Sequence, residues 1–222
     1  MDEIQNIKLR YRKRSENPLI ENFYFKYFAR SERELRYSEI VNEYFGSDIR
    51  LCKFLEIGAG GGDNLLFFHR LGLPWQNLFA NELLQERIGL LEENLPASTI
   101  IPGNALDLKY ENYFDVVFQS TVFTSILDQE FKKKLALKMM GMVKKGGLIL
   151  WYDFKFNNPN NKDVKGVTKK EIRELFSEAA EIRFFSTTLA PPIGRRIGKL
   201  YNLLNFLFPF FRTHLIAVIK MN

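Results

Sequence analysis

The sequence predicts an α/β protein whose doubly wound, mostly parallel sheet has seven strands and carries helices on both faces. Three observations predict this fold. A glycine-rich turn joins a buried strand that ends at Ile57 to a helix that opens at Asp63. From residue 51 to 153, strand-like and helix-like patterns alternate, which is typical of parallel sheets. Two later strand patterns, at 181–189 and 213–221, complete the sheet.

The composition fits a globular protein with one domain. Of the 222 residues, 46% are hydrophobic and 14% aromatic, with 21 phenylalanines. The net charge of +6 permits attraction to anionic metabolites, membrane surfaces or nucleic acid and selects none of them. The single cysteine, Cys52, excludes an internal disulfide and a multi-cysteine zinc site, so we expect a packed thiol and no metal. The polar start, Met1–Ile4, and the lack of a long uncharged apolar stretch favour a cytoplasmic protein.

The glycine turn is the first candidate site. It has the spacing Gly58-x-Gly60-x-Gly62 and follows Glu56 at the strand end. Glycines allow positive φ angles and a close backbone approach, and a strand–loop–helix unit points backbone N–H groups at a nucleotide or nucleoside. The dinucleotide fingerprint G-x-G-x-x-G needs a glycine where Asp63 stands. A nicotinamide-dependent oxidoreductase is therefore an alternative that the spacing disfavours.

A carboxylate follows the second predicted strand, 77–81. Glu82 comes about 20 residues after the glycine turn, which is where doubly wound folds bind a ribose diol. The alternative is an ordinary acidic residue in the first turn of the helix predicted over 83–94, where it favours the helix dipole.

Three more segments follow in order. They are Pro102-Gly103-Asn104-Ala105 after the third strand, Phe114-Asp115-Val116-Val117 leading to Gln119 in the fourth, and Lys144-Lys145-Gly146-Gly147 before the fifth. Together with the glycine turn and Glu82, they resemble the ordered motifs of the class I S-adenosylmethionine-dependent methyltransferases. Asn104 stands where that family usually has aspartate, and Lys145 where it usually has proline.

The resemblance implies a seven-stranded Rossmann-like methyltransferase fold with S-adenosylmethionine as cofactor. This cofactor has no phosphate, and its ammonium and sulfonium groups favour a nearby carboxylate. The resemblance implies that Glu56, Gly58, Gly60 and Gly62 hold the methionine end, Glu82 the ribose, Asn104 and Ala105 the adenine, and that Gln119 lies at the cofactor end of its strand. A non-catalytic binding protein that keeps the fold is the remaining alternative.

Methyl transfer needs a base only when the acceptor loses a proton. Asp153, at the carboxyl edge of the fifth strand, is the first candidate base, with a capping or loop role as the alternative. His214, at the start of the seventh strand, is the second candidate, with a structural role as the alternative. Gln119 and Ser120 are candidate contacts of the cofactor or the acceptor. His69, in the helix after the glycine turn, is expected to be exposed.

A small acceptor is favoured. Residues 119–122 read Gln-Ser-Thr-Val rather than the [Asp/Asn]-Pro-Pro-[Tyr/Phe] run of many amino-group methyltransferases, and Cys52 is misplaced for attack on cytosine. No nucleic-acid partner is expected. Segments 152–159, 163–166, 189–192 and 212–214 resemble bacterial methyltransferases found with cell-surface polysaccharide biosynthesis. That resemblance implies a sugar or glycolipid hydroxyl as acceptor.

One domain, 1–222, is predicted in three parts: an N-terminal helical cap over 1–50, a cofactor-binding core over 51–153 and a substrate-side half over 154–222. Two helices are expected between residues 20 and 45, and the run Lys132–Lys134 is expected to be solvated. The insertion at 190–212 separates the last two strands. It is either a helix that packs on the domain or in a dimer, or an interfacial element that brings residues 195–212 to the inner face of a membrane. The oligomeric state stays open.

Overall fold

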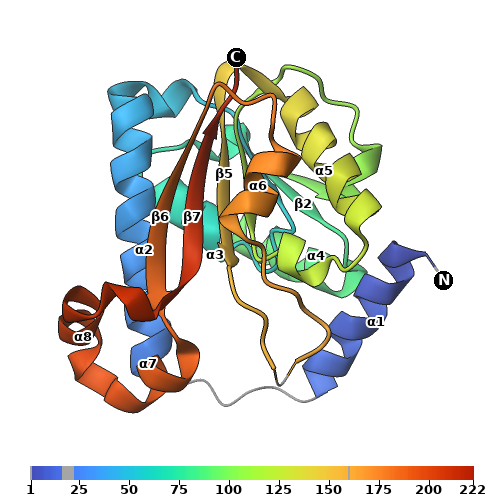
Figure 1. The fold of residues 1–222 in the computed structure, drawn as a ribbon. Coiled ribbons are helices and arrows are strands. Elements are labelled where there is room, and N and C mark those ends of the chain that lie inside the picture. The colour runs from blue at the N-terminus through green and yellow to red at the C-terminus, as the bar shows by residue number, and fades with distance from the viewer. Residues whose placement is uncertain (1, 17–22, 160) are drawn as a thin grey trace.

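The computed structural model describes residues 2–16, 23–159 and 161–222. Its seven strands form one sheet in the order β3-β2-β1-β4-β5-β7-β6 (Figure 1). All neighbouring pairs are parallel except those of β7, which runs antiparallel to both β5 and β6. The predicted fold class is confirmed. The strands are β1 (Phe54–Ile57), β2 (Leu78–Glu82), β3 (Thr99–Pro102), β4 (Phe114–Ser120), β5 (Val143–Phe154), β6 (Glu181–Leu189) and β7 (Arg212–Lys220).

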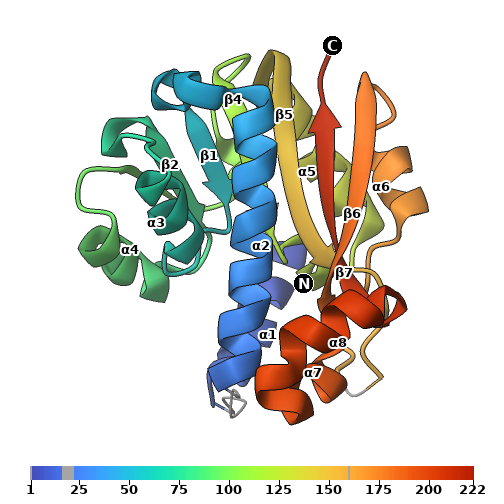
Figure 2. The same ribbon diagram turned by 90° about the vertical axis from the view of Figure 1, so that its left-hand side faces the viewer.

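Helices cover both faces of the sheet because side chains alternate along each strand. In β5, Ile149 and Trp151 face a core shared with α5 and α6, whereas Leu148 and Leu150 face a core shared with α2, α3 and α4. Figure 2 shows α2 lying along the second face with α3 and α4 beside it. The helices are α1 (Glu3–Glu16), α2 (Phe23–Tyr44), α3 (Asp63–Arg70), α4 (Ile88–Asn94), α5 (Gln129–Met142), α6 (Lys169–Leu175), α7 (Pro191–Ile197) and α8 (Tyr201–Leu207).

The N-terminal part differs from the prediction. One uninterrupted helix, α2, replaces the two helices expected between residues 20 and 45, of which residues 20–22 lie outside the described part. The sequence of α2 contains neither glycine nor proline, so nothing breaks the pattern before Gly46, whose φ is 51°. A further helix, α1, lies within the predicted helical cap over 1–50, in a part of it for which no individual helix was predicted.

Two predicted boundaries moved. The first strand starts at Phe54 rather than at residue 51, because Leu51 ends a 3₁₀ turn (η1, Gly46–Leu51) and is 77% exposed. Cys52 lies before that strand, and its thiol is buried as expected, with burial raising its pKa to about 11. The helix predicted over 83–94 begins at Ile88, after a 3₁₀ turn (η3, Gln85–Arg87).

Two polar side chains that were expected to be exposed are buried or half-buried. The Lys132 side chain is fully buried on α5, and its Nζ donates to Glu171 Oε1 of α6 at 2.9 Å. His69 is half-buried, and its ring stacks on Trp75 with centroids 3.6 Å apart. The sequence Thr168-Lys169-Lys170-Glu171 has the pattern of a capping box, and Thr168 does cap α6, accepting a hydrogen bond from the Glu171 N–H at 3.2 Å.

Within the described part of the chain, no helix combines the length and apolar character needed to cross a bilayer.

Candidate functional site

A cavity of about 1500 Å³ lies at the edge of the sheet where the parallel strands end, the lower end in Figures 1 and 2. Open α/β sheets bind ligands at this edge. The volume exceeds the usual ~300–1000 Å³ of a site for one small molecule, so a nucleoside and a second molecule fit together. The walls come from the loop after β1, the ends of β2 and β3, the turn after β4, α1, the loop after β5, and the starts of α7 and β7.

The glycine loop forms one wall. Gly58, Gly60 and Gly62 all have positive φ, at 68°, 60° and 86°. A Cβ on Gly58 would lie 2.6 Å from Val122 Cγ2, and one on Gly62 would lie 2.9 Å from Leu95 Cδ1. Gly58 and Gly60 line the cavity, whereas Gly62 lies behind it as the residue before α3. Two of the three glycines are thus required by packing against protein as well as by backbone conformation.

Glu82 lines the cavity in a fixed orientation. Its Oε2 accepts the Gly60 N–H at 2.7 Å, and its Oε1 accepts the Leu84 N–H at 2.8 Å. The Arg87 guanidinium lies 3.9 Å from Oε2. Each carboxylate oxygen has a second lone pair, so Glu82 can accept further hydrogen bonds from a bound molecule. The first-turn role weighed for Glu82 gains no support, because the helix begins only at Ile88.

Glu56 lies beneath the glycine loop rather than in the cavity wall. It is 1% exposed, and its Oε1 accepts a hydrogen bond from Asn64 Nδ2 at 2.6 Å. Its Oε2 has no partner among the described residues, and burial raises the pKa of this carboxyl well above its usual range. Asn64 does line the cavity, so Glu56 is linked to the site through this amide.

The turn after β3 is held from two sides. The Asn104 Oδ1 accepts the Leu106 N–H at 3.1 Å, which caps the 3₁₀ turn η4 (Ala105–Asp107). Asn104 and Ala105 both line the cavity. Asn81, which the sequence argument missed, donates from Nδ2 to the carbonyl oxygens of Ile101 at 2.9 Å and Gly103 at 3.1 Å. The signal available in the sequence for this role was an asparagine one residue before Glu82, at the end of the second strand.

Gln119 and Asp153 point away from the cavity. Gln119 lies two residues after Val117, and Asp153 lies two residues after Trp151. Residues two apart in a strand share a face, so both side chains face the core under the 3₁₀ turn η5 (Phe123–Ser125). Gln119 accepts the Val122 N–H at 2.9 Å and donates to Asp153 Oδ2 at 3.2 Å. Neither side chain is part of the cavity wall, so the expectation that Gln119 contacts the cofactor directly is not met by this geometry.

Asp153 is nonetheless connected to the cavity through Thr124. The Thr124 Oγ1 lies 2.6 Å from Asp153 Oδ1 and 3.3 Å from the Thr121 carbonyl oxygen, and Thr124 lines the cavity. Burial raises the pKa of Asp153 to about 7, although hydrogen bonds from Thr124 and Gln119 oppose the rise. Asp153 lies within β5 rather than just beyond it. Thr124 was not singled out in the sequence.

His214 lines the cavity from β7. Its ring stacks on Tyr152 with centroids 5.2 Å apart, and its Nδ1 lies 3.0 Å from Thr213 Oγ1. Burial, together with the positive charges of Arg33 and Lys155, lowers the pKa of His214 to about 3. The imidazole is therefore neutral near pH 7 and a weak proton acceptor. This environment favours a hydrogen-bonding role over that of a base.

Helix α1 closes the side of the cavity next to η5. Arg10 donates to the Ser125 carbonyl oxygen at 2.9 Å, and Tyr11 Oη lies 3.1 Å from Ser125 Oγ. Glu3 accepts the Leu127 N–H at 2.9 Å, and the Arg87 guanidinium lies 4.9 Å from the Tyr11 ring centroid. The apolar spacing of Ile4, Ile7 and Tyr11 was the signal for this helix, and all three residues line the cavity.

The loop after β5 forms another wall. Asn157 Oδ1 accepts the Gly166 N–H and Asn161 Oδ1 accepts the Asp163 N–H, both at 3.0 Å. Their oxygens therefore brace the loop, and their amide nitrogens remain as the donors that they offer to the cavity. Phe154 and Phe156 contribute aromatic surface to the same wall.

Comparisons with known proteins agree with this architecture. Residues 55–151, a little under half of the chain, match the family model described as a methyltransferase domain. No curated protein matches the chain in sequence. Among solved structures, the N-methyltransferase NodS of Bradyrhizobium japonicum, in complex with S-adenosyl-L-homocysteine, is 13% identical, with a TM-score of 0.66 over 97% of this chain and 98% of that one.

Two more structures show how widely this fold is used. A methyltransferase of Methanosarcina mazei described as S-adenosylmethionine-dependent is 15% identical, with a TM-score of 0.60 over 82% of this chain and 96% of that one. The [4+2]-cyclase SpnF is 13% identical, with a TM-score of 0.58 over 84% of this chain and 80% of that one. At such identities the structures establish the fold alone, and the methyltransferase-domain model matches residues 55–151.

Proposed function

We propose that the protein transfers the methyl group of S-adenosylmethionine to a hydroxyl group of a sugar or glycolipid. The observation that carries this proposal is the buried Thr124–Asp153 pair, in which Thr124 lines the cavity and Asp153 lies behind it. A hydroxyl must lose its proton during methylation, and a carboxylate whose pKa is about 7 accepts a proton far better at neutral pH than an ordinary aspartate.

The residues around the glycine loop fit the cofactor. Glu82 has lone pairs for the ribose hydroxyls, and Asn104 and Ala105 flank the place proposed for adenine. The Asn64 amide would serve the methionine end together with the backbone of Gly58 and Gly60. Glu56, whose Oε2 is unpartnered among the described residues, would act through Asn64. In our proposal Gly62 and Gln119 act by shaping the site rather than by direct contact.

When bound, the cofactor supplies a methyl group already activated by the sulfonium. The protein then has to bind, orient and exclude water. Helix α1, with Ile4, Ile7 and Tyr11 in the cavity wall, supports such exclusion on the side of Arg87 and Glu82.

The Thr124 hydroxyl has two hydrogen-bonded states. When Asp153 is ionised, Thr124 donates to it across 2.6 Å; when Asp153 is protonated, Asp153 donates and Thr124 turns to the Thr121 carbonyl at 3.3 Å. We propose that the acceptor hydroxyl gives its proton to Thr124 Oγ1 while Thr124 gives its own to Asp153. Charge and protons balance, since the carboxylate becomes a neutral acid and Thr124 is regenerated.

The wall formed by the loop after β5 suits a sugar. The Asn157 and Asn161 amides offer donors, and Phe154 and Phe156 offer ring faces and edges, a combination that binds a ring with polar rims. The neutral His214 and Thr213 add further hydrogen-bonding groups at the same wall.

Two measurements test the proposal. Calorimetric titration with S-adenosylmethionine should show binding at one site per chain, and radiolabelled methyl donor should then label a hydroxyl acceptor among nucleotide sugars and lipid-linked sugars. A parallel set of amine acceptors is the control. If the cofactor binds but label enters only amines, the hydroxyl acceptor is wrong; if the cofactor does not bind, the whole proposal is wrong.

A further inference from the structure

The insertion between β6 and β7 carries a continuous group of exposed apolar side chains. We call the following residues the α7–α8 face: Leu200, Leu203, Phe206, Leu207, Phe210 and Phe211, with Arg195, Arg196 and Lys199 beside them. Phe206 is 78% exposed and Phe210 is 69% exposed. The rings of Phe210 and Phe211 lie 4.6 Å apart, so apolar surface is concentrated rather than scattered. Concentrated exposed apolar surface marks an interaction site.

The start of α2 extends this surface. Helix α2 contacts both α7 and α8, and its Phe23 and Tyr27 are exposed. The Phe23 and Tyr27 rings stack with centroids 6.1 Å apart. Deeper in the same contact, Phe28 stacks on the buried Tyr201 at 5.9 Å. The inner aromatic row therefore fixes α8 on the protein, and the outer row is left in solvent.

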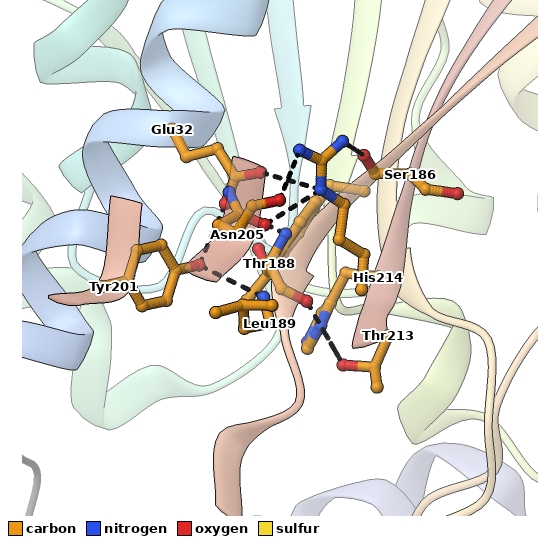
Figure 3. A network of polar contacts seen from close by, with 10 residues as sticks. Glu32, Ser186, Thr188, Leu189, Tyr201, Asn205, Thr213 and His214 are labelled. Atoms are coloured by element: carbon orange, nitrogen blue, oxygen red, sulfur yellow. Dashed lines mark hydrogen bonds and ion pairs between the residues drawn. The ribbon is translucent and has the colours of Figure 1, made fainter. Parts of the chain in front are cut away.

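A polar network holds the insertion against the sheet (Figure 3). Glu32 of α2 accepts hydrogen bonds from the Tyr201 hydroxyl at 2.9 Å and the Thr188 N–H at 3.0 Å. Arg212 donates to Asn205 Oδ1 at 2.9 Å and to the Ser186 carbonyl oxygen at 3.3 Å. The α7–α8 face is consequently presented on a fixed support, and Thr213 and His214, which line the cavity, continue directly from Arg212.

The charge of the insertion has one sign. Residues 190–212 contain four basic residues and no Asp or Glu. Of these, Arg212 is turned inward, with its Nε 4.0 Å from Glu32 Oε1, whereas Arg196 and Lys199 are exposed beside the apolar residues. Exposed aromatic and aliphatic side chains flanked by Arg and Lys without acidic residues fit the boundary of an anionic bilayer.

The location of the α7–α8 face in the fold also fits contact with a bilayer. Figures 1 and 2 show α7 and α8 at the lower end of the molecule, the end at which the parallel strands finish and the cavity lies. Pro191, Pro192 and Arg195 of α7 line the cavity themselves. A flat partner that contacts the α7–α8 face would therefore lie beside the acceptor side of the cavity.

We propose that the α7–α8 face, together with Phe23 and Tyr27, docks the protein on an anionic lipid bilayer. The aromatic side chains enter the interface, and Arg196 and Lys199 contact lipid phosphates. A protein partner is less well matched, because exposed aromatic side chains beside exposed basic residues, with no acidic residue in the insertion, would require an acidic rim on that partner. Docking itself does not depend on the acceptor; that it presents a glycolipid to the cavity rests on the proposed function.

Vesicle flotation tests the docking. The wild-type protein should float with phosphatidylcholine vesicles that contain phosphatidylglycerol, and much less with phosphatidylcholine alone or at high salt. Replacing Phe206, Phe210 and Phe211 by serine should weaken vesicle binding by at least about tenfold. The pair Arg196→Glu and Lys199→Glu should weaken it by about 30-fold or more, since each basic residue near an anionic surface favours binding about fivefold.

A matched control replaces apolar residues that are exposed elsewhere, with Leu51→Ser and Leu137→Ser. It should bind vesicles like the wild type, and every variant should keep its cofactor affinity, which reports an intact fold independently of docking. Equal flotation of wild-type and serine-substituted protein would overturn the proposal, as would no flotation with anionic vesicles. A sedimentation experiment in which the serine substitutions dissociate an oligomer would instead identify a self-association surface. That result would also overturn the docking proposal.

Discussion

The two halves of the sheet build their parts of the cavity in different ways. On the side of β1, β2 and β3, the wall is made by backbone loops that follow each strand within a few residues, such as Gly58–Gly61 and Gly103–Ala105. On the side of β5, β6 and β7, the wall is made by side chains held through distant contacts, such as Glu32 with Tyr201, 169 residues apart. The first kind of site is local in sequence, and the second is not.

The two halves of the sheet therefore depend on different structural requirements. The local side depends on φ angles and strand ends, so its geometry is common to many proteins of the fold. The distant side depends on buried hydrogen bonds whose partners come from α2, β6 and α8, and it adds an insertion with an aromatic surface. We expect cofactor binding to reside in the first half and acceptor choice in the second, and four predictions test that division.

The largest effect is expected where the two halves meet, at Thr124 and Asp153. Asp153→Asn and Thr124→Val should each lower kcat by about 10²–10⁴-fold while leaving cofactor affinity unchanged, because each interrupts proton transfer. Wild-type activity should rise with pH through about 7 as Asp153 ionises, and the variants should lose this rise. Thr187→Val is the control, because the buried Thr187 hydroxyl has no hydrogen-bond partner within the described residues. Unchanged rates in both variants would contradict the proposed proton transfer through Thr124 to Asp153.

The next effect separates the halves by stability. Glu32→Ala leaves the buried Thr188 N–H and Tyr201 hydroxyl without their acceptor, so we expect a loss of about 2–4 kcal/mol in the free energy of unfolding. Thermal denaturation should show a drop of about 2–4 °C for each kcal/mol. Glu34→Ala is the control, since Glu34 makes only a 3.7 Å ion pair at the surface. A shift no larger than that of the control would show that the network does not anchor the insertion.

A third prediction addresses the local half. Glu82→Ala should weaken S-adenosylmethionine binding by about 10–100-fold in calorimetry, the loss expected for hydrogen bonds to a charged group. Glu82→Gln, which retains an acceptor for the Gly60 N–H, should lose less. The exposed neighbour Glu86 provides the control as Glu86→Ala. Affinity equal to the wild type in Glu82→Ala would contradict the ribose assignment.

The smallest effect concerns the pH dependence of stability, where two groups oppose each other. The pKa of Asp153 is raised in the folded state, so its contribution falls as pH rises from about 4 to about 7. The pKa of His214 is lowered, so its contribution falls as pH drops from about 6.5 towards 3. Urea denaturation of Asp153→Asn should therefore show stability that increases with pH between 4.5 and 6.5 more steeply than in the wild type. His214→Asn should show the opposite change, and parallel curves for all three proteins would count against both pKa shifts.

Sequence reasoning was most successful where structure is local. The glycine spacing, the position of Glu82 and the capping residue Thr168 depend on neighbours within a few residues, and these features lie where the pattern indicated. The fold class followed because a period of two and a period of about four in the apolar residues are themselves local signals.

Other features depend on partners that the sequence does not place. Lys132 is buried because Glu171 lies opposite it, 39 residues away, and a run of three lysines gives no sign of this. Asp153 was recognised as a carboxylate at the right edge, but its orientation toward Thr124 follows from the register of β4 with β5. Within the predicted helical cap, α1 was not identified as a separate helix, because its apolar stripe is short and its contacts are on η5, more than a hundred residues later.

The packing of Gly62 has a consequence for how such motifs evolve. Because a side chain at this position would collide with Leu95 and adopt an unfavourable φ, selection for a folded domain preserves this glycine regardless of chemistry. A descendant that had lost methyltransferase activity would keep the glycine pattern as long as it kept the fold. Searches for catalytically active members should therefore weight Thr124 and Asp153 above the glycines.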